Sequence, residues 1–310
     1  MQISNEEYKQ LKPLLFSLGY RLLGSVNDAE DMVQETFMRA YLINENAMVV
    51  NKKAYLCKMM TNRCLDLLKS ARYKREQYIG PWNPDPLVMD LSAYAQEEPS
   101  EAYLRKEGLS IAYMRMMEHL GAAERAVLLL REVFTFSYTE IAEILEKKEE
   151  HCRKLFSRAK QKLSSCNDEN LDYTKNKSII DSFVDAFQNQ KMEDLLELIS
   201  DNVTLFSDGG GEVHAATRPI FTRSNVLAFL SGIVKKAPDD FYYQLKTVNA
   251  QPALVCYMNG QLQSVISFSI VQERINEIYI TLNPHKLPKY EQACLMSNIL
   301  GEERNGGLDD

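Results

Sequence analysis

The first 75 residues carry a helical pattern of apolar positions. Leucines recur at three- and four-residue intervals between residues 11 and 23, which predicts one face of an amphipathic helix. A second helix is expected from Ala29 to Leu42, with a buried side formed by Val33, Thr36, Phe37 and Ala40. A third and longer helix is expected from about Ala54 to Lys74, after a polar loop at 44–53. The pattern therefore predicts an all-α bundle over residues 1–75.

A second helical block covers residues 105–167. Helices are expected from near Glu101 to Leu120 and from Ala122 to Phe134, followed by two shorter helices within 137–163. The turn between these two helices begins at Glu146, and the second helix runs from Glu149 to Leu163. Two short helices joined by a tight turn are typical of a helix-turn-helix.

The segment between the two blocks, residues 76–104, has no helical pattern at its start. Three prolines and a glycine lie within the nine residues Tyr78–Pro86, and this composition is incompatible with a helix. The same stretch holds Trp82, the only tryptophan of the chain. We expect an acidic, proline-bearing linker.

Beyond residue 174 the pattern changes from helices to alternation. Two helical stretches, Ser178–Gln188 and Met192–Ile199, come first, and a further helix is expected at about 224–236. The alternating segments are Val203–Phe206, Tyr242–Val248, Ala253–Met258, Ser264–Val271 and Arg274–Ile280. Asn259-Gly260 is a hairpin turn signal. This order predicts a separate α+β domain with a curved antiparallel sheet over 174–290, followed by an acidic tail at 291–310.

Charge divides the chain in the same way. The 310 residues carry a net charge of −7, yet residues 147–163 hold seven Lys or Arg against two Glu. Residues 1–75 hold twelve basic and eight acidic groups, whereas 76–104 hold six acidic groups and no basic one. A basic helix pair in an acidic protein indicates an anionic partner, and duplex DNA fits this geometry.

Cysteine spacing and hydropathy exclude several classes of protein. The six cysteines form no Cys-x-x-Cys pair and none has zinc spacing to a histidine, so we expect no metal, disulfide framework or cofactor. No apolar run is long enough to cross a bilayer, and residues 1–10 are polar rather than signal-like. A cytoplasmic protein with no membrane partner is expected.

Several segments resemble a known family. Asp28–Phe37 is similar to the sigma-factor region that grips the RNA polymerase clamp, and Ala54–Arg75 to the helix that melts and reads the minus-10 element. Residues 105–163 are similar to the domain that reads the minus-35 element. The chain thus resembles an extracytoplasmic-function sigma factor. Three segments indicate the subgroup with a cone-shaped SnoaL-like domain at the C-terminus: Tyr78–Pro86, Asp208–Gly211 and Asn283–Leu287.

The resemblance has three departures. Glu146 stands in the turn of the helix pair where glycine is usual, and Leu155 stands where many relatives have arginine. His285 replaces the usual aspartate of the last motif. The expected partners are nevertheless core RNA polymerase and promoter DNA with its minus-10 and minus-35 elements.

Candidate DNA contacts lie on two helices. Holding a separated strand needs positive charge and polar side chains, which the third helix offers at Asn62, Arg63, Asp66, Lys69 and Arg72. Reading the major groove needs donors on the second helix of the helix-turn-helix, and the candidates there are Arg153, Lys154 and Arg158. For either set the alternative is an ordinary solvated helix face.

Two further contact surfaces follow from the resemblance. Asp31, Gln34 and Glu35 would dock on basic residues of the polymerase clamp. A regulatory contact between the linker and the C-terminal domain would use Tyr78, Gly80, Pro81, Trp82, Pro84, Pro86, Asp208, Gly209, Gly210, Asn283 and Pro284. The alternative for the linker is a rigid spacer.

The expected function is promoter-specific initiation of transcription without covalent chemistry, modulated in cis by the C-terminal domain. Two other classes remain open. One is a helix-turn-helix regulator with a ligand-sensing C-terminal domain, and an unidentified small-molecule ligand of that domain is left open. The other is a SnoaL-type enzyme fused to DNA-binding helices, with Asp208, His214 and Tyr257 as candidate acid–base groups.

Overall fold

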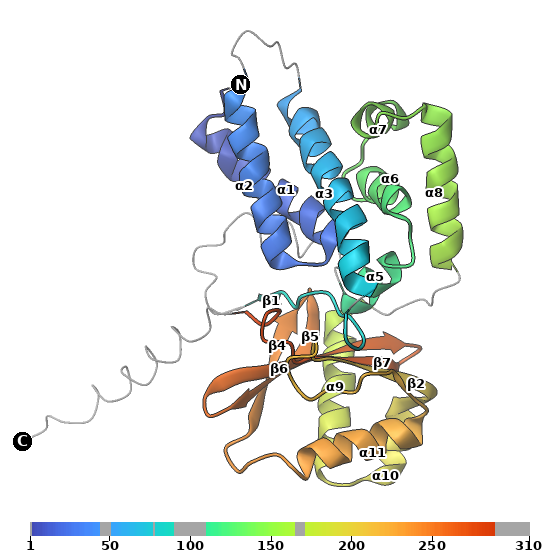
Figure 1. Cartoon of the computed structure of the whole chain (residues 1–310). Coiled ribbons are helices and arrows are strands. Elements are labelled where there is room, and N and C mark those ends of the chain that lie inside the picture. The colour runs from blue at the N-terminus through green and yellow to red at the C-terminus, as the bar shows by residue number, and fades with distance from the viewer. Residues whose placement is uncertain (1, 44–50, 77, 90–109, 165–170, 289–310) are drawn as a thin grey trace, which may run out of the picture.

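The computed structural model describes residues 2–43, 51–76, 78–89, 110–164 and 171–288. Side chains at 71–76, 89 and 164 lie outside this description, as does the predicted helix start near Glu101. In Figure 1 helices α1 to α8 form the upper part of the molecule. A sheet with helices α9 to α11 forms the lower part, and the linker runs between the two.

The upper part contains seven helices among the described residues. They are α1 (Asn5–Leu23), α2 (Val26–Leu42), α3 (Lys52–Glu76), α5 (Ile111–Met117), α6 (Ala122–Glu132), α7 (Tyr138–Leu145) and α8 (Glu149–Ser164). Capping boxes begin α1 at Ser4 and α7 at Ser137, where each serine accepts from a backbone N–H three residues on. The predicted inner side of α2 is confirmed, because Val33, Thr36, Phe37 and Ala40 are all buried.

One hydrophobic core joins the two helical blocks. Leu18, Phe37 and Met60 come from the first block and lie in the same buried cluster as Leu128 and Ile144 of the second. The cluster also contains Leu155, which is 7 % exposed, so this departure from the family pattern is a core residue of α8. The blocks that the sequence places on either side of a linker therefore pack directly against each other.

The lower part is an α+β unit, as predicted. Its elements are α9 (Tyr173–Gln188), α10 (Met192–Leu198), β2 (Ile199–Asp208), β3 (Ile220–Phe221), α11 (Arg223–Val234), β4 (Tyr242–Val248), β5 (Gln251–Met258), β6 (Gln261–Val271) and β7 (Arg274–Thr281). The predicted turn at Asn259-Gly260 is confirmed, with φ of 52° and 67° at its two residues.

The sheet is mixed rather than wholly antiparallel. Its strand order is β1-β4-β5-β6-β7-β2-β3, and β2 pairs with β7 in parallel from Thr204 against Glu277 to Asp208 against Thr281. The other neighbouring pairs are antiparallel. A long crossover through β3, α11 and the β4–β6 meander separates β2 from β7, and such a connection permits a parallel pairing.

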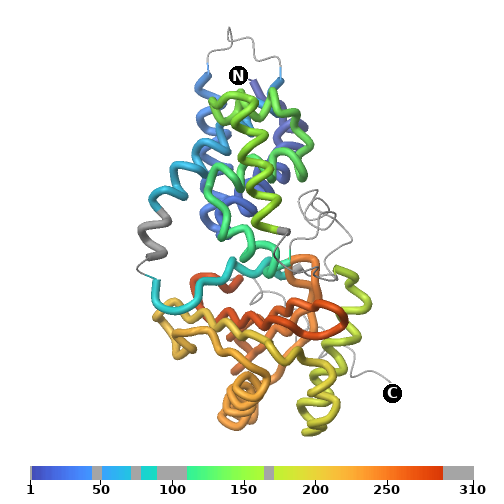
Figure 2. The backbone as a smooth tube through the Cα atoms, turned by 90° about the vertical axis from the view of Figure 1, so that its right-hand side faces the viewer, coloured from blue at the N-terminus to red at the C-terminus, as the bar shows by residue number. Residues whose placement is uncertain are grey.

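The two faces of the sheet have different covers. One face packs on the helices through a core that includes Ile180, Val226 and Phe268. The other face meets the segment after β7 and the linker, through a cluster that contains Val255 and Leu287. The linker also supplies a strand, β1 (Val88–Met89), which pairs with the edge strand β4. Figure 2 shows the linker in cyan between the upper helices and the sheet.

Candidate nucleic-acid interface and interdomain contacts

The helix-turn-helix consists of α7 and α8. Glu146 ends α7 in the left-handed conformation, with φ of 54°, and its N–H donates to the Ala142 carbonyl. A non-glycine residue pays about 1–2 kcal/mol for this conformation. The tight turn therefore forms even though glutamate replaces the usual glycine.

The three candidate base contacts of α8, Arg153, Lys154 and Arg158, are exposed. Arg153 donates to Glu149 at 2.6 Å, and its guanidinium lies 4.4 Å from the centre of the Tyr138 ring. Lys154 pairs with Glu150 at 2.7 Å. Exposed pairs of this kind contribute about 0–1 kcal/mol, so phosphates can replace these glutamates at little cost.

On α3 the candidate residues fall into two groups. Asp66 and Lys69 are exposed and pair with each other at 2.8 Å, whereas Asn62 and Arg63 are half-buried. The Arg63 guanidinium pairs with Glu35 of α2, which also accepts from Arg39 at 3.1 Å. The structure thus joins a candidate DNA residue to a candidate polymerase residue. The side chain of Arg72 lies outside the described part of the chain.

The outer side of α2 carries apolar as well as polar side chains. Asp31 and Gln34 are exposed, and Glu35 is half-buried. The same side continues into Met38, which is 66 % exposed, and Leu42, which is 85 % exposed. Helical spacing in the sequence places Met38 on the same side as Asp31, and the same spacing extends this side to Leu42.

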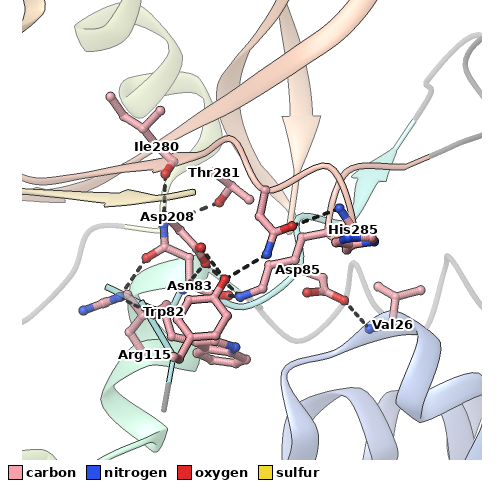
Figure 3. Close-up of polar contacts among 12 residues, drawn as sticks. Val26, Trp82, Asn83, Asp85, Arg115, Asp208, Ile280, Thr281 and His285 are labelled. Atoms are coloured by element: carbon pink, nitrogen blue, oxygen red, sulfur yellow. Dashed lines mark hydrogen bonds and ion pairs between the residues drawn. The ribbon is translucent and has the colours of Figure 1, made fainter. Parts of the chain in front are cut away.

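The carboxylate of Asp208, at the end of β2, collects donors from two distant segments. It is fully buried and accepts from Tyr78 Oη at 2.5 Å, Asn83 N at 2.7 Å and Lys286 Nζ at 2.8 Å. Lys286 also donates to the Asn83 carbonyl, and Asn283 donates to Tyr78 Oη at 2.9 Å. Figure 3 shows Asp208 beside the linker residues Trp82 and Asn83. We call this set of contacts the Asp208 clasp.

Arg115 of α5 ties the second helical block to the same clasp. Its guanidinium donates to the Trp82 carbonyl at 2.6 Å and to Asn83 Oδ1 at 2.7 Å (Figure 3). The guanidinium also lies 3.9 Å from the centre of the Phe206 ring. Burial lowers the pKa of Arg115 from its ordinary value, and nearby acids, Asp208 among them, oppose that shift. On the other side of the linker, Lys286 Nζ lies 4.2 Å from the Trp82 ring.

A second set of contacts, the Asn249 clasp, holds the end of the linker to α1 and α2. The Asp85 carboxylate accepts from Val26 N at 2.9 Å, and Tyr20 Oη donates to the Asp85 carbonyl at 2.6 Å. Asn249, in the β4–β5 turn, donates to Tyr20 Oη at 2.7 Å and accepts from Leu87 N at 2.9 Å. Burial raises the pKa of Asp85 to about 6, although the charge of Lys286 lowers it.

The other residues predicted for the interdomain contact have the following surroundings. Gly80 lies against the Thr217 backbone with φ of 87°, and a side chain at Gly210 would collide with Asn283. Pro84 and Pro86 are buried, Pro81 is half-buried and Gly209 packs in its own turn beside Val213 and Ala215. Pro284 is exposed, as is His285, whose Nε2 lies 3.9 Å from Glu212.

Sequence reasoning missed six central residues. Asn83, Asp85 and Lys286 stand inside the quoted motifs, where Asp85 and Lys286 could have been chosen for their charge. Arg115, Tyr20 and Asn249 belong to no motif, and only the packing of three segments brings them to the linker.

The candidate acid–base groups do not meet. Asp208 is engaged by the clasp, His214 is exposed, and Tyr257 is buried in the cluster that contains Val255 and Leu287, with its ring stacked 4.9 Å from the Tyr242 ring. The space between α9 and the sheet is filled with apolar side chains such as Phe183 and Phe268. Across the described ranges, no three His, Cys, Asp or Glu could hold a metal ion, and no helix is long and apolar enough to span a bilayer.

Comparisons with known proteins match these elements. The family model of sigma-70 region 2 covers residues 8–73, and that of sigma-70 region 4 covers residues 110–163. The ECF RNA polymerase sigma factor SigJ of Mycobacterium tuberculosis is 29 % identical over 285 residues, which are 90 % of this chain and 88 % of that protein. The ECF RNA polymerase sigma factor SigW of Bacillus subtilis is 31 % identical over 139 residues, 43 % of this chain and 72 % of that protein.

The fold agrees over nearly the whole length. The crystal structure of SigJ from M. tuberculosis aligns with a TM-score of 0.74 at 24 % identity, covering 91 % of this chain and 98 % of that one. The likeness therefore includes the SnoaL-like lower part as well as the helices. Region 2 corresponds to α1–α3 and region 4 to α5–α8. The chain belongs to the extracytoplasmic-function (ECF) sigma factors, which bind core RNA polymerase and direct it to promoters.

Proposed function

We propose that this sigma factor is held in a closed state by its own SnoaL-like domain, which grips the linker between regions 2 and 4. The Asp208 clasp is the observation that carries the proposal. It links the end of β2, the linker and, through Arg115, region 4. The Asn249 clasp adds region 2 through Tyr20.

The chemistry of the clasp suits a two-state contact. A buried carboxylate and a buried ammonium are costly unless all their hydrogen bonds form together. Asp208 is 0 % exposed and the Lys286 side chain 9 % exposed, and both hold the backbone of Asn83. Partial release would leave a buried charge unpaired, so the linker is expected to leave the clasp as a unit.

The residue-level roles in initiation belong to the same proposal. Asp31, Gln34 and Glu35, extended by Met38 and Leu42, would form the surface that docks on core polymerase. Arg153, Lys154 and Arg158 of α8 would contact the minus-35 element. Asn62, Arg63, Asp66, Lys69 and Arg72 of α3 would contact the opened minus-10 strand. Exposure of α8 and the outer side of α2 supports the first two assignments.

A purely non-enzymatic role is part of the proposal. It is supported by the separation of Asp208, His214 and Tyr257 and by the apolar filling beneath the sheet. A lone helix-turn-helix regulator would have no need of the region 2 bundle that residues 8–73 match.

Run-off transcription with purified core polymerase tests the proposal. The full chain is compared with the variants Lys286→Met and Asn83→Ala and with chains trimmed stepwise from residue 310 toward residue 167. The closed-state proposal expects the clasp variants to give more transcript than the full chain. If neither they nor any trimmed chain initiates at a specific site, the assignment of promoter-directed initiation to this chain fails. Equal amounts of transcript from the wild-type chain and the clasp variants would contradict only the proposed cis regulation.

Arg158 provides a separate test of the minus-35 contact. We expect Arg158→Ala to weaken transcription from promoters that depend on the minus-35 element by about 1–3 kcal/mol, or roughly five- to a hundredfold. Binding to core polymerase should stay unchanged in a pull-down with labelled protein. Lys177→Ala, which removes another exposed charge, on α9, is the control. Loss of core binding in Arg158→Ala would show that α8 faces the polymerase instead.

A further inference from the structure

The ring of Tyr138, the first residue of α7, packs between α6 and α8. The guanidinium of Arg153 on α8 lies 4.4 Å from the centre of the Tyr138 ring, and that of Arg131 on α6 lies 5.0 Å from it. The Phe156 ring of α8 meets the Tyr138 ring at 81°, with 5.9 Å between the ring centres. Contacts from two helices therefore hold the Tyr138 ring in place, and Arg153 lies over it.

A second contact restrains Arg153 through a glutamate. The guanidinium donates to one oxygen of Glu149 at 2.6 Å, and the Thr139 hydroxyl of α7 donates to the other oxygen at 3.1 Å. The pKa of Glu149 is lowered, first by the hydrogen bond from Arg153 and then by that from Thr139. Arg153 therefore contacts α7 in two ways, directly through the Tyr138 ring and indirectly through Glu149.

The neighbouring Lys154 is held less closely. Its ammonium pairs with Glu150, one turn earlier on the same helix, and both side chains are exposed. An ammonium is a point charge on a flexible stem, whereas a guanidinium presents its N–H donors in a rigid fork. A fixed orientation matters for reading a base edge, but not for neutralising a phosphate. The two adjacent residues are thus suited to different contacts with DNA.

The place of Arg153 on α8 suits a base contact. It lies in the second turn of the helix, which begins at Glu149, and the N-terminal turns of a recognition helix contact base edges. Guanine presents O6 and N7 in the major groove, and an arginine bonds to both when its fork faces that edge. The pair with Glu149 is exposed, so a base can replace the carboxylate at little cost while Tyr138 still packs on the guanidinium.

We propose that Tyr138 is a positioning residue, which fixes the guanidinium of Arg153 so that Arg153 distinguishes a guanine of the minus-35 element from the other bases. Lys154 then contacts the DNA backbone and carries no sequence preference. This inference rests on the assignment of α8 to the minus-35 element proposed above. It adds which residue of α8 sets the sequence preference and what holds that residue.

Selection from a promoter library with randomised minus-35 positions tests the proposal, with core polymerase and the full chain. The wild type should favour guanine at one position by about five- to a hundredfold, the range of a bidentate contact. Arg153→Lys keeps the charge but not the fork, so it should reduce this preference to within about twofold of none. Tyr138→Leu should lower the preference about two- to fivefold, as expected for the loss of an exposed cation–π contact. Tyr138→Phe keeps the ring and should keep the preference.

Lys154→Ala is the matched comparison, because it changes an exposed basic residue next to Arg153. We expect it to weaken binding evenly across the library and to leave the preferred base unchanged. Thermal unfolding of each variant checks that the helices remain folded.

The position of the Arg153 guanidinium can also be measured without changing Tyr138. Protons over the face of an aromatic ring are shielded, so the Nε–H signal of Arg153 should lie upfield of the position usual for a solvated arginine. Arg153→Lys identifies the signal in the NMR spectrum by removing it. A signal at the usual position would contradict the proposal, even if Tyr138→Leu does not fold.

Two outcomes of the selection would also overturn the proposal. One is the wild-type base preference in Tyr138→Leu, and the other is the wild-type preference in Arg153→Lys. Failure of the proposed function gives a different result, because the wild-type chain would then favour no base at any position. In that case the assignment of α8 to the minus-35 element fails, and the role of Tyr138 fails with it.

Discussion

At the scale of single residues, the contact between the linker and the SnoaL-like domain depends on the buried pair of Asp208 and Lys286. Tyr78, Asn83 and Lys286 all donate hydrogen bonds to the Asp208 carboxylate. Such a pair adds little stability compared with an apolar pair of the same shape, but removal of one partner is costly. We infer that its value to the protein is to specify one position of the linker.

Lys286→Met should therefore destabilise the closed chain by about 3–5 kcal/mol, because Asp208 would keep its burial and lose its counter-charge. Urea unfolding followed by the fluorescence of Trp82, which contacts Lys286, measures the loss. Lys177→Met removes an exposed pair with Asp181 and should cost about 0–1 kcal/mol. A similar cost for both variants would mean that water reaches Asp208.

Asp85 makes stability depend on pH. Burial raises its pKa from 3.8 to about 6, with Lys286 opposing and Asp28 reinforcing the shift. The folded chain therefore holds this proton more tightly than the unfolded chain. The stabilisation is complete below about pH 4 and is lost as pH rises through about 6.

Asp85→Asn keeps an acceptor for Val26 N and removes this titration. We expect the variant to be more stable than the wild type by about 1–3 kcal/mol at pH 7, with the difference vanishing near pH 4. Urea unfolding at pH 4, 5, 6 and 7 measures the difference curve. A constant difference over this range would show that the Asp85 carboxyl keeps its ordinary pKa.

At the scale of elements, the junction of α1 and α2 depends on a glycine. Gly24 ends α1 with φ of 70°, and a Cβ there would lie 2.5 Å from the Trp82 ring. Gly24 thus permits both the chain reversal between α1 and α2 and the close packing of the Trp82 ring. Gly260, in the β5–β6 turn, has a similar φ of 67° with nothing within 4 Å of a Cβ.

These two glycines separate backbone strain from steric conflict. Gly260→Ala should cost about 1–2 kcal/mol from its left-handed backbone alone. Gly24→Ala should cost about 2–5 kcal/mol, because the collision with Trp82 adds about 1–3 kcal/mol. Thermal and urea unfolding of the two variants provide the comparison. Equal costs would indicate that the Trp82 ring moves aside freely.

Elements were easier to predict from the sequence than their junctions. The buried side of α2 followed from residues three and four apart, and the β5–β6 turn followed from Asn259-Gly260, because both signals are local. The parallel pairing of β2 with β7 and the shared core of regions 2 and 4 depend on contacts between distant segments, for which the pattern holds no information. Arg115 illustrates the limit, since an arginine in α5 looks like a solvated residue until the linker lies against it.

At the scale of the whole molecule, the linker is held by three bodies at once. Region 2 contacts it at Gly24, region 4 at Arg115 and the SnoaL-like domain at Asp208. Under the closed-state proposal, the binding of core polymerase competes with these contacts. The apparent affinity for core polymerase would then be reduced by the fraction of molecules that are closed.

Arg115→Ala should raise the affinity for core polymerase at least tenfold. The closed state would lose two charge-assisted hydrogen bonds, each worth about 1.5–3 kcal/mol, whereas the open state would lose none of them. Fluorescence anisotropy of labelled full chain titrated with core polymerase measures the change. Lys191→Ala, which removes an exposed pair with Asp185, is the control. Unchanged affinity in Arg115→Ala would mean that the closed state does not oppose polymerase.

The pairing of β1 with β4 has a consequence for solubility. Val88 and Met89 cover the edge of the sheet at Val248 and Thr247, so an opened chain exposes the unpaired backbone of β4. Bare sheet edges recruit other strands and promote aggregation. A chain whose linker has left the sheet, and which polymerase has not yet bound, would thus tend to self-associate and be short-lived. The closed form would serve as the storage state of the sigma factor.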